Sequence, residues 1–290
     1  MGYILYRLGI FLAQRLNRRT SFRFARFIAR IWYAFNDRSN IALRNNLSVA
    51  MNKPPQSREV RETGMKVFEN FAKNITEFLS LPNMTRERLM EKISVSGFEK
   101  FDAAFKKKRG LILLTSHLGN WEMGGVYVAQ CGYPLYAISL PHSRDKIDDI
   151  FTEFRHQKGV KSIPVGVGTL KEAYRVLKNG NILAFLGDWD STGSGEYVNF
   201  FRKKAQMPKG PVAMALMTGA IIAPALTYRV GEDAHHIDFL EPIEVESNGD
   251  NQGALSHYLQ KISDILTDYI GKHLECWNAF HQIWENHFRG

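Results

Sequence analysis

Residues 111–125 read LILLTSHLGNWEMGG, and the fold can be worked out from this stretch. Its first four residues form an apolar run after a Lys/Arg-rich segment, which is typical of a buried strand in a mostly parallel sheet. Asn120 is a good N-cap, so the residues that follow it are expected to begin a helix. The stretch therefore predicts strand, turn and helix. His117 lies in the turn, at the carboxyl end of the strand, where open α/β sheets bind ligands.

Two side chains of this stretch suggest acid–base chemistry. His117 can take the proton of an attacking hydroxyl, and Glu122 lies in the first turn of the predicted helix, where the macrodipole favours its ionised form. An ionised carboxylate near an imidazole fixes the imidazole tautomer and stabilises the imidazolium. The sequence contains no G-x-S-x-G, G-x-x-x-x-G-K-[ST], H-E-x-x-H or C-x-x-C motif. The pattern indicates a general base with an orienting acid, although a structural hydrogen bond would have the same spacing.

The chain beyond this stretch alternates between strand-like and helical patterns. This alternation predicts an α/β fold with a mixed, mainly parallel sheet flanked by helices. The run 212–227 is interrupted by Gly219 and Pro224, so it is expected to be a buried helix that leads into a buried strand. The tail 254–287 is expected to be helical. The other strands are predicted at 93–97, 134–139, 162–165, 182–187, 220–229 and 235–241, and the intervening helices at 121–130, 144–157 and 169–178.

A helical segment precedes this core. Residues 40–51 and 58–81 have helical patterns, and NKPPQS at 52–57 separates them. The sequence therefore predicts two parts. Residues 1–90 form an N-terminal helical, membrane-associating segment, and residues 91–290 form the α/β domain.

The first 36 residues carry the membrane prediction. Residues 3–16 are too short and too charged for a span, which needs about 20 apolar residues. A helix over 18–36 would have a basic face beside an aromatic and aliphatic one, as in helices that lie in a membrane interface. A helix that packs its apolar face on the core and solvates its arginines has the same pattern. The basic face consists of Arg19, Arg23, Arg26 and Arg30, and the apolar face of Phe24, Phe27, Ile28, Ile31 and Phe35.

Composition narrows the class of partner. The 290 residues carry a net charge of +9, which suits nucleic acid, an anionic lipid surface or an acidic carrier protein. No nucleic-acid-binding signature accompanies the charge, so nucleic acid is not expected as a partner. Two cysteines imply no disulfide framework, and the arginines that interrupt the first apolar stretch argue against a cleavable signal peptide.

A family resemblance sharpens this interpretation. HLGNWE, 117–122, resembles the H-x-x-x-x-[DE] acyltransferase box in the H-x-G-N-W-E form of the bacterial lipid A biosynthesis acyltransferases, which are related to phosphatidylinositol mannoside acyltransferases. In the stretch 182–190, Trp189 replaces the glutamine of the family's Asp-Gln-Asp, and in 198–211 Arg202 replaces a glycine. The further stretches that resemble the family are 137–155, 182–190, 198–211, 221–229 and 276–284.

The resemblance implies a glycerolipid-acyltransferase-like fold and a reaction. A fatty acyl chain would move from an acyl thioester, on acyl carrier protein or CoA, to a hydroxyl of a lipid A precursor, at the cytoplasmic face of the inner membrane. His117 would be the general base and Glu122 would orient it. No metal and no cofactor are implied. The protein would attach to the anionic membrane surface through residues 1–90, as a peripheral or monotopic protein.

The resemblance also implies substrate-binding residues. Arg155 matches a functional arginine and is expected to meet the oxyanion or an acceptor phosphate. Asp188 is expected to position Arg155 or an acceptor hydroxyl. Backbone amides near Gly119 and Asn120 are further candidate oxyanion donors, and Arg202 is expected to meet acceptor phosphates or an acidic carrier protein.

Other functions remain open at this stage. One is acylation of a lysophospholipid or a phosphatidylinositol mannoside from acyl-CoA. Another is a hydrolase that uses the same pair of residues on water. A third is a non-catalytic peripheral membrane protein.

Overall fold

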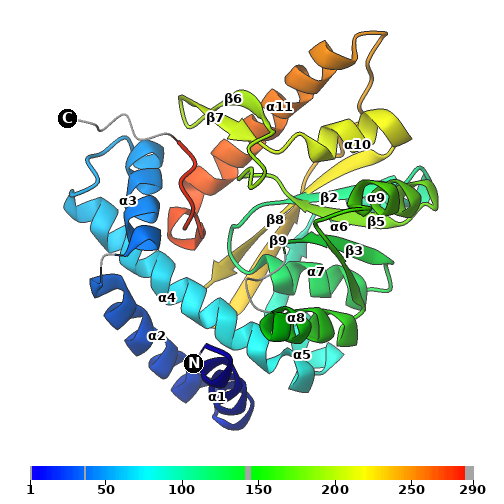
Figure 1. Ribbon diagram of the computed structural model, residues 1–290. Helices are drawn as coiled ribbons and strands as arrows, with labels where there is room; N and C mark the ends of the chain where they lie inside the picture. The colour runs from blue at the N-terminus through cyan, green and yellow to red at the C-terminus, as the bar shows by residue number, and fades with distance from the viewer. Residues whose placement is uncertain (1, 36, 141–144, 285–290) are drawn as a thin grey trace.

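The computed structural model describes residues 2–35, 37–140 and 145–284, and its core is a mixed sheet (Figure 1). The described strands form one seven-stranded sheet and one separate hairpin. In the large sheet β8 and β9 are antiparallel, and every other neighbouring pair is parallel. In spatial order the sheet contains β1 (Ile93–Ser96), β9 (Ala234–Phe239), β8 (Ile221–Val230), β2 (Leu111–Thr115), β5 (Ile182–Leu186), β3 (Leu135–Ser139) and β4 (Val160–Pro164).

Helices cover both faces of this sheet. Alternate residues of a strand point to opposite sides, and in the buried strands both sets are apolar, so each face needs a cover. Ile112 and Leu114 pack in the core that contains the buried residues of α9, α10 and α11. Leu111 and Leu113 pack in the core that contains those of α6, α7 and α8. The helices after the first strand are α6 (Phe98–Lys106), α7 (Trp121–Gln130), α8 (Asp145–Gln157), α9 (Thr169–Lys178), α10 (Gly210–Thr218) and α11 (Asn251–Lys272).

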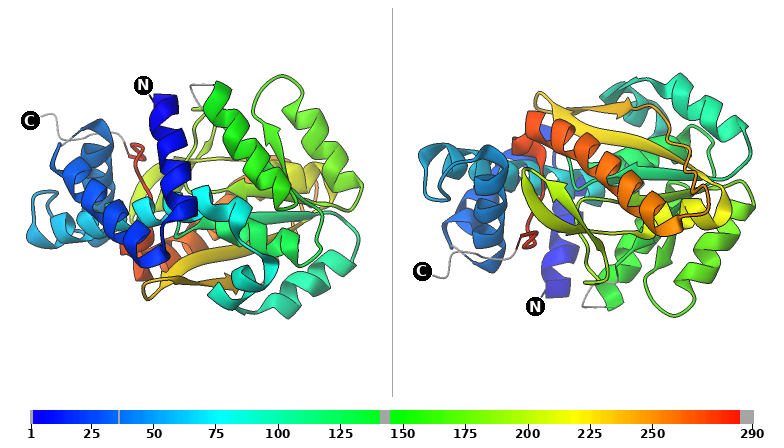
Figure 2. Two further views of the ribbon diagram at one scale, coloured as in Figure 1. Left: turned by 90° about the horizontal axis from the view of Figure 1, so that it is seen from below. Right: turned by 90° about the horizontal axis from the view of Figure 1, so that it is seen from above.

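The N-terminal helices form a group at one side of the sheet (Figures 1 and 2). The long helix α4 runs between this group and the rest of the molecule, and its residues Val67 and Phe68 belong to the same core as β2. The elements that precede the sheet are α1 (Gly2–Arg15), α2 (Arg18–Ala34), α3 (Arg38–Met51), α4 (Arg58–Ser80), the short 3-10 helix η1 (Leu81–Asn83) and α5 (Arg86–Lys92).

The α2 helix packs through one phenylalanine and three small residues, and it leaves most of its large apolar side chains outside. Ser21, Phe22, Ala25 and Ala29 are its buried residues. The apolar face predicted from the sequence does not pack on the core, because its members are 42–75% exposed: Phe24, Phe27, Ile28, Ile31 and Phe35. Within the described part of the chain, no helix is both long enough and apolar enough to cross a membrane.

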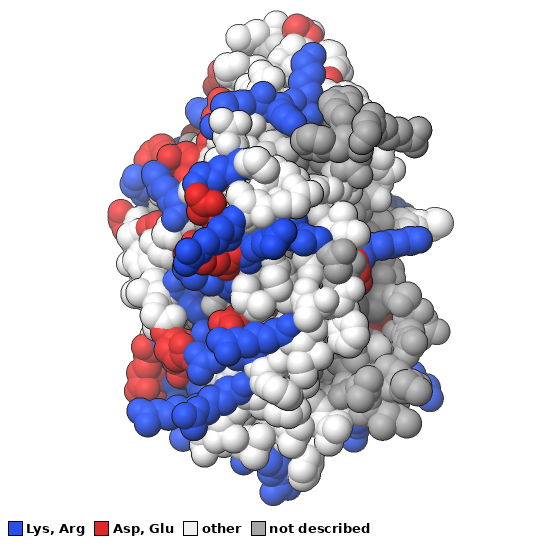
Figure 3. Space-filling view, turned by 90° about the vertical axis from the view of Figure 1, so that its left-hand side faces the viewer, with Lys and Arg blue, Asp and Glu red and all other residues white. Residues whose placement is uncertain are grey.

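The basic face of α2 is partly neutralised by the protein itself. Arg26 pairs with Glu232 at 2.9 Å, and Arg30 pairs with Glu69 at 2.7 Å. Figure 3 shows this side of the molecule, with rows of Lys and Arg, several of them beside Asp or Glu, and uncharged surface between the rows.

The structure confirms the predicted fold class and its strands. Each predicted strand is present, and the run 212–227 is α10 followed by β8, as expected. Two local predictions need correction. Residues 196–207 form a hairpin of β6 (Glu196–Phe200) and β7 (Lys203–Met207). The sequence did not predict this hairpin, because its turn lacks the glycine that normally marks such turns. The tail is helical only to Lys272, and the 3-10 helix η2 (Leu274–Cys276) then leads into extended chain; residues 285–287 lie outside the described part.

Candidate active site

The turn after β2 holds His117 in a fixed position. The C-terminal segment binds this turn on one side: the Gly119 N–H donates to the Cys276 carbonyl at 2.8 Å, and the Asn278 N–H donates to the His117 carbonyl at 2.8 Å. Gly119 has φ +57°, and a Cβ there would lie 2.3 Å from the Thr227 carbonyl oxygen. The turn therefore needs glycine for both its backbone conformation and its close approach to β8.

Asp188 orients His117. One carboxylate oxygen of Asp188 accepts from His117 Nδ1 at 2.9 Å and from the His117 N–H at 3.0 Å. The other oxygen accepts from Trp277 Nε1 at 2.9 Å. Asp188 is only 1% exposed, and its burial raises the pKa of the carboxyl. The charge that His117 carries when protonated, together with these hydrogen bonds, lowers the pKa by more than burial raises it, so the pKa lies below its ordinary value. Because Nδ1 is taken by the carboxylate, Nε2 is the nitrogen that can accept a substrate proton.

The register of the sheet explains this pairing. β2 and β5 are parallel neighbours, and Thr115 lies opposite Leu186. His117 and Asp188 each follow two residues later, so both side chains emerge at the same carboxyl edge. Sequence analysis predicted Asp188 at this edge but assigned it to Arg155 or to the acceptor hydroxyl.

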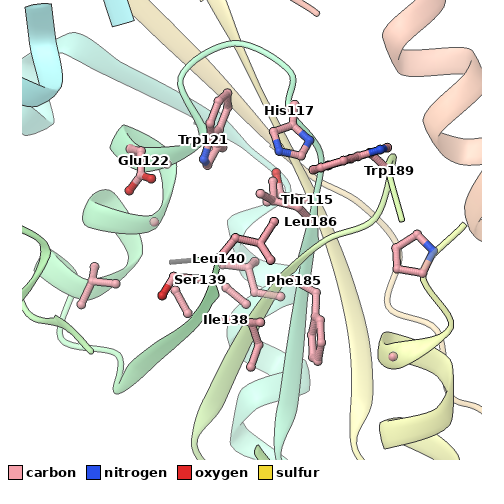
Figure 4. A pocket seen from close by; sticks show the side chains of 18 of the residues that line it. Thr115, His117, Trp121, Glu122, Ile138, Ser139, Leu140, Phe185, Leu186 and Trp189 are labelled. Carbon is pink, nitrogen blue, oxygen red and sulfur yellow. The ribbon is translucent and has the colours of Figure 1, made fainter. Parts of the chain in front are cut away.

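The predicted contact between Glu122 and His117 is wrong. Glu122 faces α8 and holds Arg155 with two hydrogen bonds, Nε to Oε2 at 2.9 Å and Nη2 to Oε1 at 2.5 Å. In Figure 4 the indole of Trp121 stands between Glu122 and the imidazole of His117. The helix begins at Trp121, so the next residue is already rotated away from the turn.

Arg155 is held inside the protein by this pair. Its side chain is 11% exposed, and the guanidinium lies 5.8 Å from the centroid of the Phe151 ring. Burial lowers the pKa of Arg155, but the charge and hydrogen bonds of Glu122 outweigh this effect, so the pKa is raised overall. Glu122 therefore neutralises a buried arginine, which is a strong structural requirement for both residues.

A cavity of about 690 Å³ opens at the carboxyl edge of the sheet, next to His117. Part of its wall is apolar and comes from one stripe of α7, from the sheet beneath it and from α8. Another part carries hydroxyl groups and comes from the loop after β5. His117, Glu122 and Arg155 all line the cavity. The apolar part includes Gly125, Val128, Leu135 and Phe151, and the hydroxyl-bearing part includes Ser191, Thr192 and Ser194.

The remaining predicted residues lie outside the cavity wall. Asn120 is the N-cap of α7, as predicted, and its side chain accepts from the Met123 N–H at 3.3 Å. The Gly119 N–H is used by Cys276, so it is not free to bind an oxyanion. Arg202 lies in the β6–β7 turn with φ +66°, a left-handed conformation that favours glycine, and reaches toward α3. Its position gives no support to a substrate-binding role.

Sequence reasoning missed a buried ionic cluster behind the turn. Glu77 of α4 is fully buried and binds Arg229 Nη2 at 2.7 Å, His235 Nε2 at 3.0 Å and Asn120 Nδ2 at 2.7 Å. Burial raises the pKa of Glu77, but the charges of His235 and Arg229 lower it more strongly. The cluster ties α4 to β8, β9 and the N-cap of α7, and no short-range pattern predicts contacts between residues so distant in sequence. Among the residues that the structure describes, no group of three or more His, Cys, Asp or Glu side chains is arranged to hold a metal ion.

Comparison with known proteins identifies the relatives of this chain. The model of a family described as bacterial lipid A biosynthesis acyltransferase matches residues 1–286. The chain is 28% identical to a phosphatidylinositol mannoside acyltransferase of Mycolicibacterium smegmatis over 257 residues, which cover 87% of this chain and 82% of the relative. It is 24% identical to a protein of the same name from Mycobacterium tuberculosis over 83% of this chain and 76% of the relative. It is also 24% identical to the lipid A biosynthesis palmitoleoyltransferase of Escherichia coli, over 60% of this chain and 56% of that protein.

Proposed function

The chain belongs to the bacterial lipid A biosynthesis acyltransferase family, and we propose that it transfers a fatty acyl chain from a thioester to a sugar hydroxyl of a glycolipid. The observation that supports this most strongly is the arrangement of His117. Its Nδ1 is held by a buried carboxylate, and its side chain lines a cavity with one apolar part and one hydroxyl-bearing part. A general base with its tautomer fixed beside such a cavity suits a reaction between an acyl chain and a polar acceptor.

The proposed chemistry is direct transfer. The acceptor hydroxyl gives its proton to His117 Nε2 while its oxygen attacks the thioester carbonyl and forms a tetrahedral oxyanion. The oxyanion then collapses, the carbon–sulfur bond breaks, and the departing thiolate takes the proton from the imidazolium. Asp188 stabilises the imidazolium between these steps. The positive end of the α7 helix dipole, which begins at Trp121, lies beside His117 and favours the oxyanion.

The acyl chain is assigned to the apolar part of the cavity. Residues 121, 124, 125 and 128 line the cavity and follow helical spacing, so they form one stripe of α7. Gly125 leaves this stripe open, because a Cβ there would meet only Leu135 Cδ2, at 3.6 Å. In this proposal Glu122 and Arg155 fix α7 against α8 and so hold the wall of the acyl site. An acceptor phosphate would have to compete with Glu122 for Arg155.

The acceptor is proposed as a glycolipid of one of two kinds. The sequence motif favoured a lipid A precursor, whereas the relatives that cover most of this chain carry the name of phosphatidylinositol mannoside acyltransferases. Both acceptors are glycolipids, so each carries sugar beside lipid chains. The donor is proposed as acyl carrier protein or CoA thioester.

The site is proposed to work at the cytoplasmic face of the inner membrane. The exposed apolar side chains of α2, with Leu8 and Phe11 of α1, form a surface that a membrane interface would cover. Tyr6 of α1 lines the cavity, so the same helix connects this surface with the site. Arg19 and Arg23 on the exposed side would favour anionic lipid.

Acyl transfer with defined substrates tests the proposal. Radiolabelled acyl-carrier-protein and acyl-CoA donors are each paired with a lipid A precursor, with phosphatidylinositol mannoside and with lysophospholipid, in vesicles that contain anionic lipid. We expect product on a glycolipid, and we expect His117→Ala to abolish it. Product on lysophospholipid alone, release of free fatty acid alone, or full activity of the His117→Ala protein would contradict the proposal.

A further inference from the structure

The two sides of His117 differ in chemistry. Figure 4 shows Trp121 on one side of the imidazole and Trp189 on the other. The ring centroids lie 5.1 Å and 6.3 Å from that of His117, and both indoles are steeply inclined to the imidazole. Trp121 begins the apolar stripe of α7, whereas Trp189 begins the loop whose hydroxyl groups line the cavity. A saturated acyl chain fits the first side, and a polyhydroxylated ring fits the second.

Trp189 is held flat by a second ring. Its indole stacks on the imidazole of His281, with ring centroids 3.9 Å apart and an angle of 4° between the planes. The backbone of His281 is itself fixed, because its carbonyl accepts from Asn46 Nδ2 of α3 at 2.7 Å. Since one face of the indole is covered by His281 and Trp189 lines the cavity, the opposite face is the one that a ligand can meet.

The loop after Trp189 presents its hydroxyl groups in a fixed arrangement. Asp190 accepts from the Thr192 N–H at 3.0 Å, the Thr192 hydroxyl at 2.7 Å and the Gly195 N–H at 2.7 Å. The hydroxyls of Thr192 and Ser194 lie 2.6 Å apart. The Thr192 hydroxyl gives its proton to Asp190 and accepts from the hydroxyl and the N–H of Ser194, so it holds Ser194 in place. The Ser194 hydroxyl is exposed and lines the cavity, so it can accept from a ligand hydroxyl at little cost in loop ordering.

We propose that Trp189, supported by His281, is the platform for the pyranose ring of the acceptor, and that Ser194 accepts a hydrogen bond from one of its hydroxyls. The negative face of an indole attracts the weakly positive C–H groups of a sugar face. A ring in van der Waals contact, with carbon atoms about 4 Å away, would lie beside His117 and could place an exocyclic hydroxyl at Nε2. This assignment rests on the proposed function and names the part of the site that selects a sugar acceptor.

Kinetics of the full-length protein test the platform. Trp189→Ala is expected to raise KM for the glycolipid acceptor about tenfold, with KM for the acyl thioester changed less than about twofold. Trp189→Phe keeps a flat ring and should lie within about threefold of wild type. His281→Ala should fall between these two variants, because it removes only the support. Tyr197→Ala, an exposed aromatic on β6 that does not line the cavity, is the matched control, and thermal unfolding verifies that every variant is folded.

Two kinetic results would overturn the platform. One is an unchanged KM for the glycolipid in Trp189→Ala. The other is an equal rise in KM for the glycolipid and for lysophospholipid, which carries no sugar ring. A wild-type protein that acylates no glycolipid contradicts the proposed function instead.

A binding measurement then tests the platform without acyl transfer. Saturation-transfer NMR with methyl α-mannopyranoside and with N-acetylglucosamine should show contact at the sugar C–H protons in wild type and loss of this contact in Trp189→Ala. Equal signals from the two proteins would contradict the platform.

Discussion

Asp188 and Glu122 are two carboxylates near one histidine, and they do different work. Asp188 is almost fully buried and accepts three hydrogen bonds, two of them from His117. Glu122 lies five residues from His117 in sequence, yet both of its oxygens are held by Arg155. Asp188, which is far from His117 in sequence, orients the base, whereas Glu122, which is near it in sequence, joins α7 to α8.

Which carboxylate contacts His117 is therefore decided by the register of the sheet and not by closeness in sequence. Two residues after the paired positions 115 and 186, parallel strands bring His117 and Asp188 together. The five-residue spacing of His117 and Glu122 is divided between a turn and the start of a helix, which points the two side chains in different directions. Four measurements test whether Asp188 and Glu122 have these different roles.

Removal of the base should have the largest effect. His117→Ala is expected to lower kcat by about 100- to 10,000-fold, the range for loss of a general base. His257→Ala, an exposed histidine on α11, should leave kcat unchanged. Acyl transfer under saturating donor and acceptor measures both. If the two variants lose activity equally, neither carboxylate can be acting through His117.

Disruption of the Glu122–Arg155 pair should reduce stability. Glu122→Gln removes the charge that neutralises a largely buried guanidinium, so we expect a loss of about 3 kcal/mol in the free energy of unfolding, the lower end of the range for breaking a buried pair. Replacement of both residues by leucine should cost less than Glu122→Gln, because it leaves no buried charge without its partner. Glu172→Gln, which breaks an exposed pair on α9, should cost less than about 0.5 kcal/mol. Urea unfolding measures all four proteins, and equal losses for the α7 and α9 pairs would show that the Glu122 pair is an ordinary surface contact.

The pH dependence of stability should separate Asp188 from an ordinary carboxylate. Its pKa in the folded protein is lowered from 3.8, because the charge of His117 and the hydrogen bonds outweigh burial. The unfolded state therefore binds the proton first as pH falls, and the stabilisation by Asp188 is present above the unfolded pKa and lost through the folded one. The stability gap between wild type and Asp188→Asn should shrink as pH falls below about 5. A gap that stays constant over this range would contradict the depressed pKa.

Much of the fold could be predicted from the sequence, because its signals are local. The apolar runs gave the strands, and Asn120 marked the first residue of α7. Positive φ at Phe201 and Arg202 hid the β6–β7 turn, since neither residue type normally adopts it. The division into segments 1–90 and 91–290 stays a prediction, although α4 shares a core with the sheet.

The site was only partly predictable, because its geometry depends on long-range contacts. His117 was placed at the correct edge by its position after β2. The residues that hold the His117 turn come from three distant places: the loop after β5, the α4 helix and the C-terminal segment. Asp188 and Asn278 bind His117 itself, and Glu77 binds the neighbouring Asn120. Trp189 was recognised as a departure from the family pattern, but its stack on His281 joins residues that no local pattern connects.

Double-mutant kinetics test most directly whether Asp188, rather than Glu122, acts through His117. Asp188→Asn and Glu122→Gln are each measured by single-turnover acyl transfer, in the wild-type protein and in the His117→Ala background. We predict that Asp188→Asn lowers the rate at least about tenfold when His117 is present and less than about threefold when it is absent, whereas Glu122→Gln lowers it by the same factor in both. An effect of Glu122→Gln that disappears with His117, beside an effect of Asp188→Asn that persists, would contradict this account and restore Glu122 as the orienting acid.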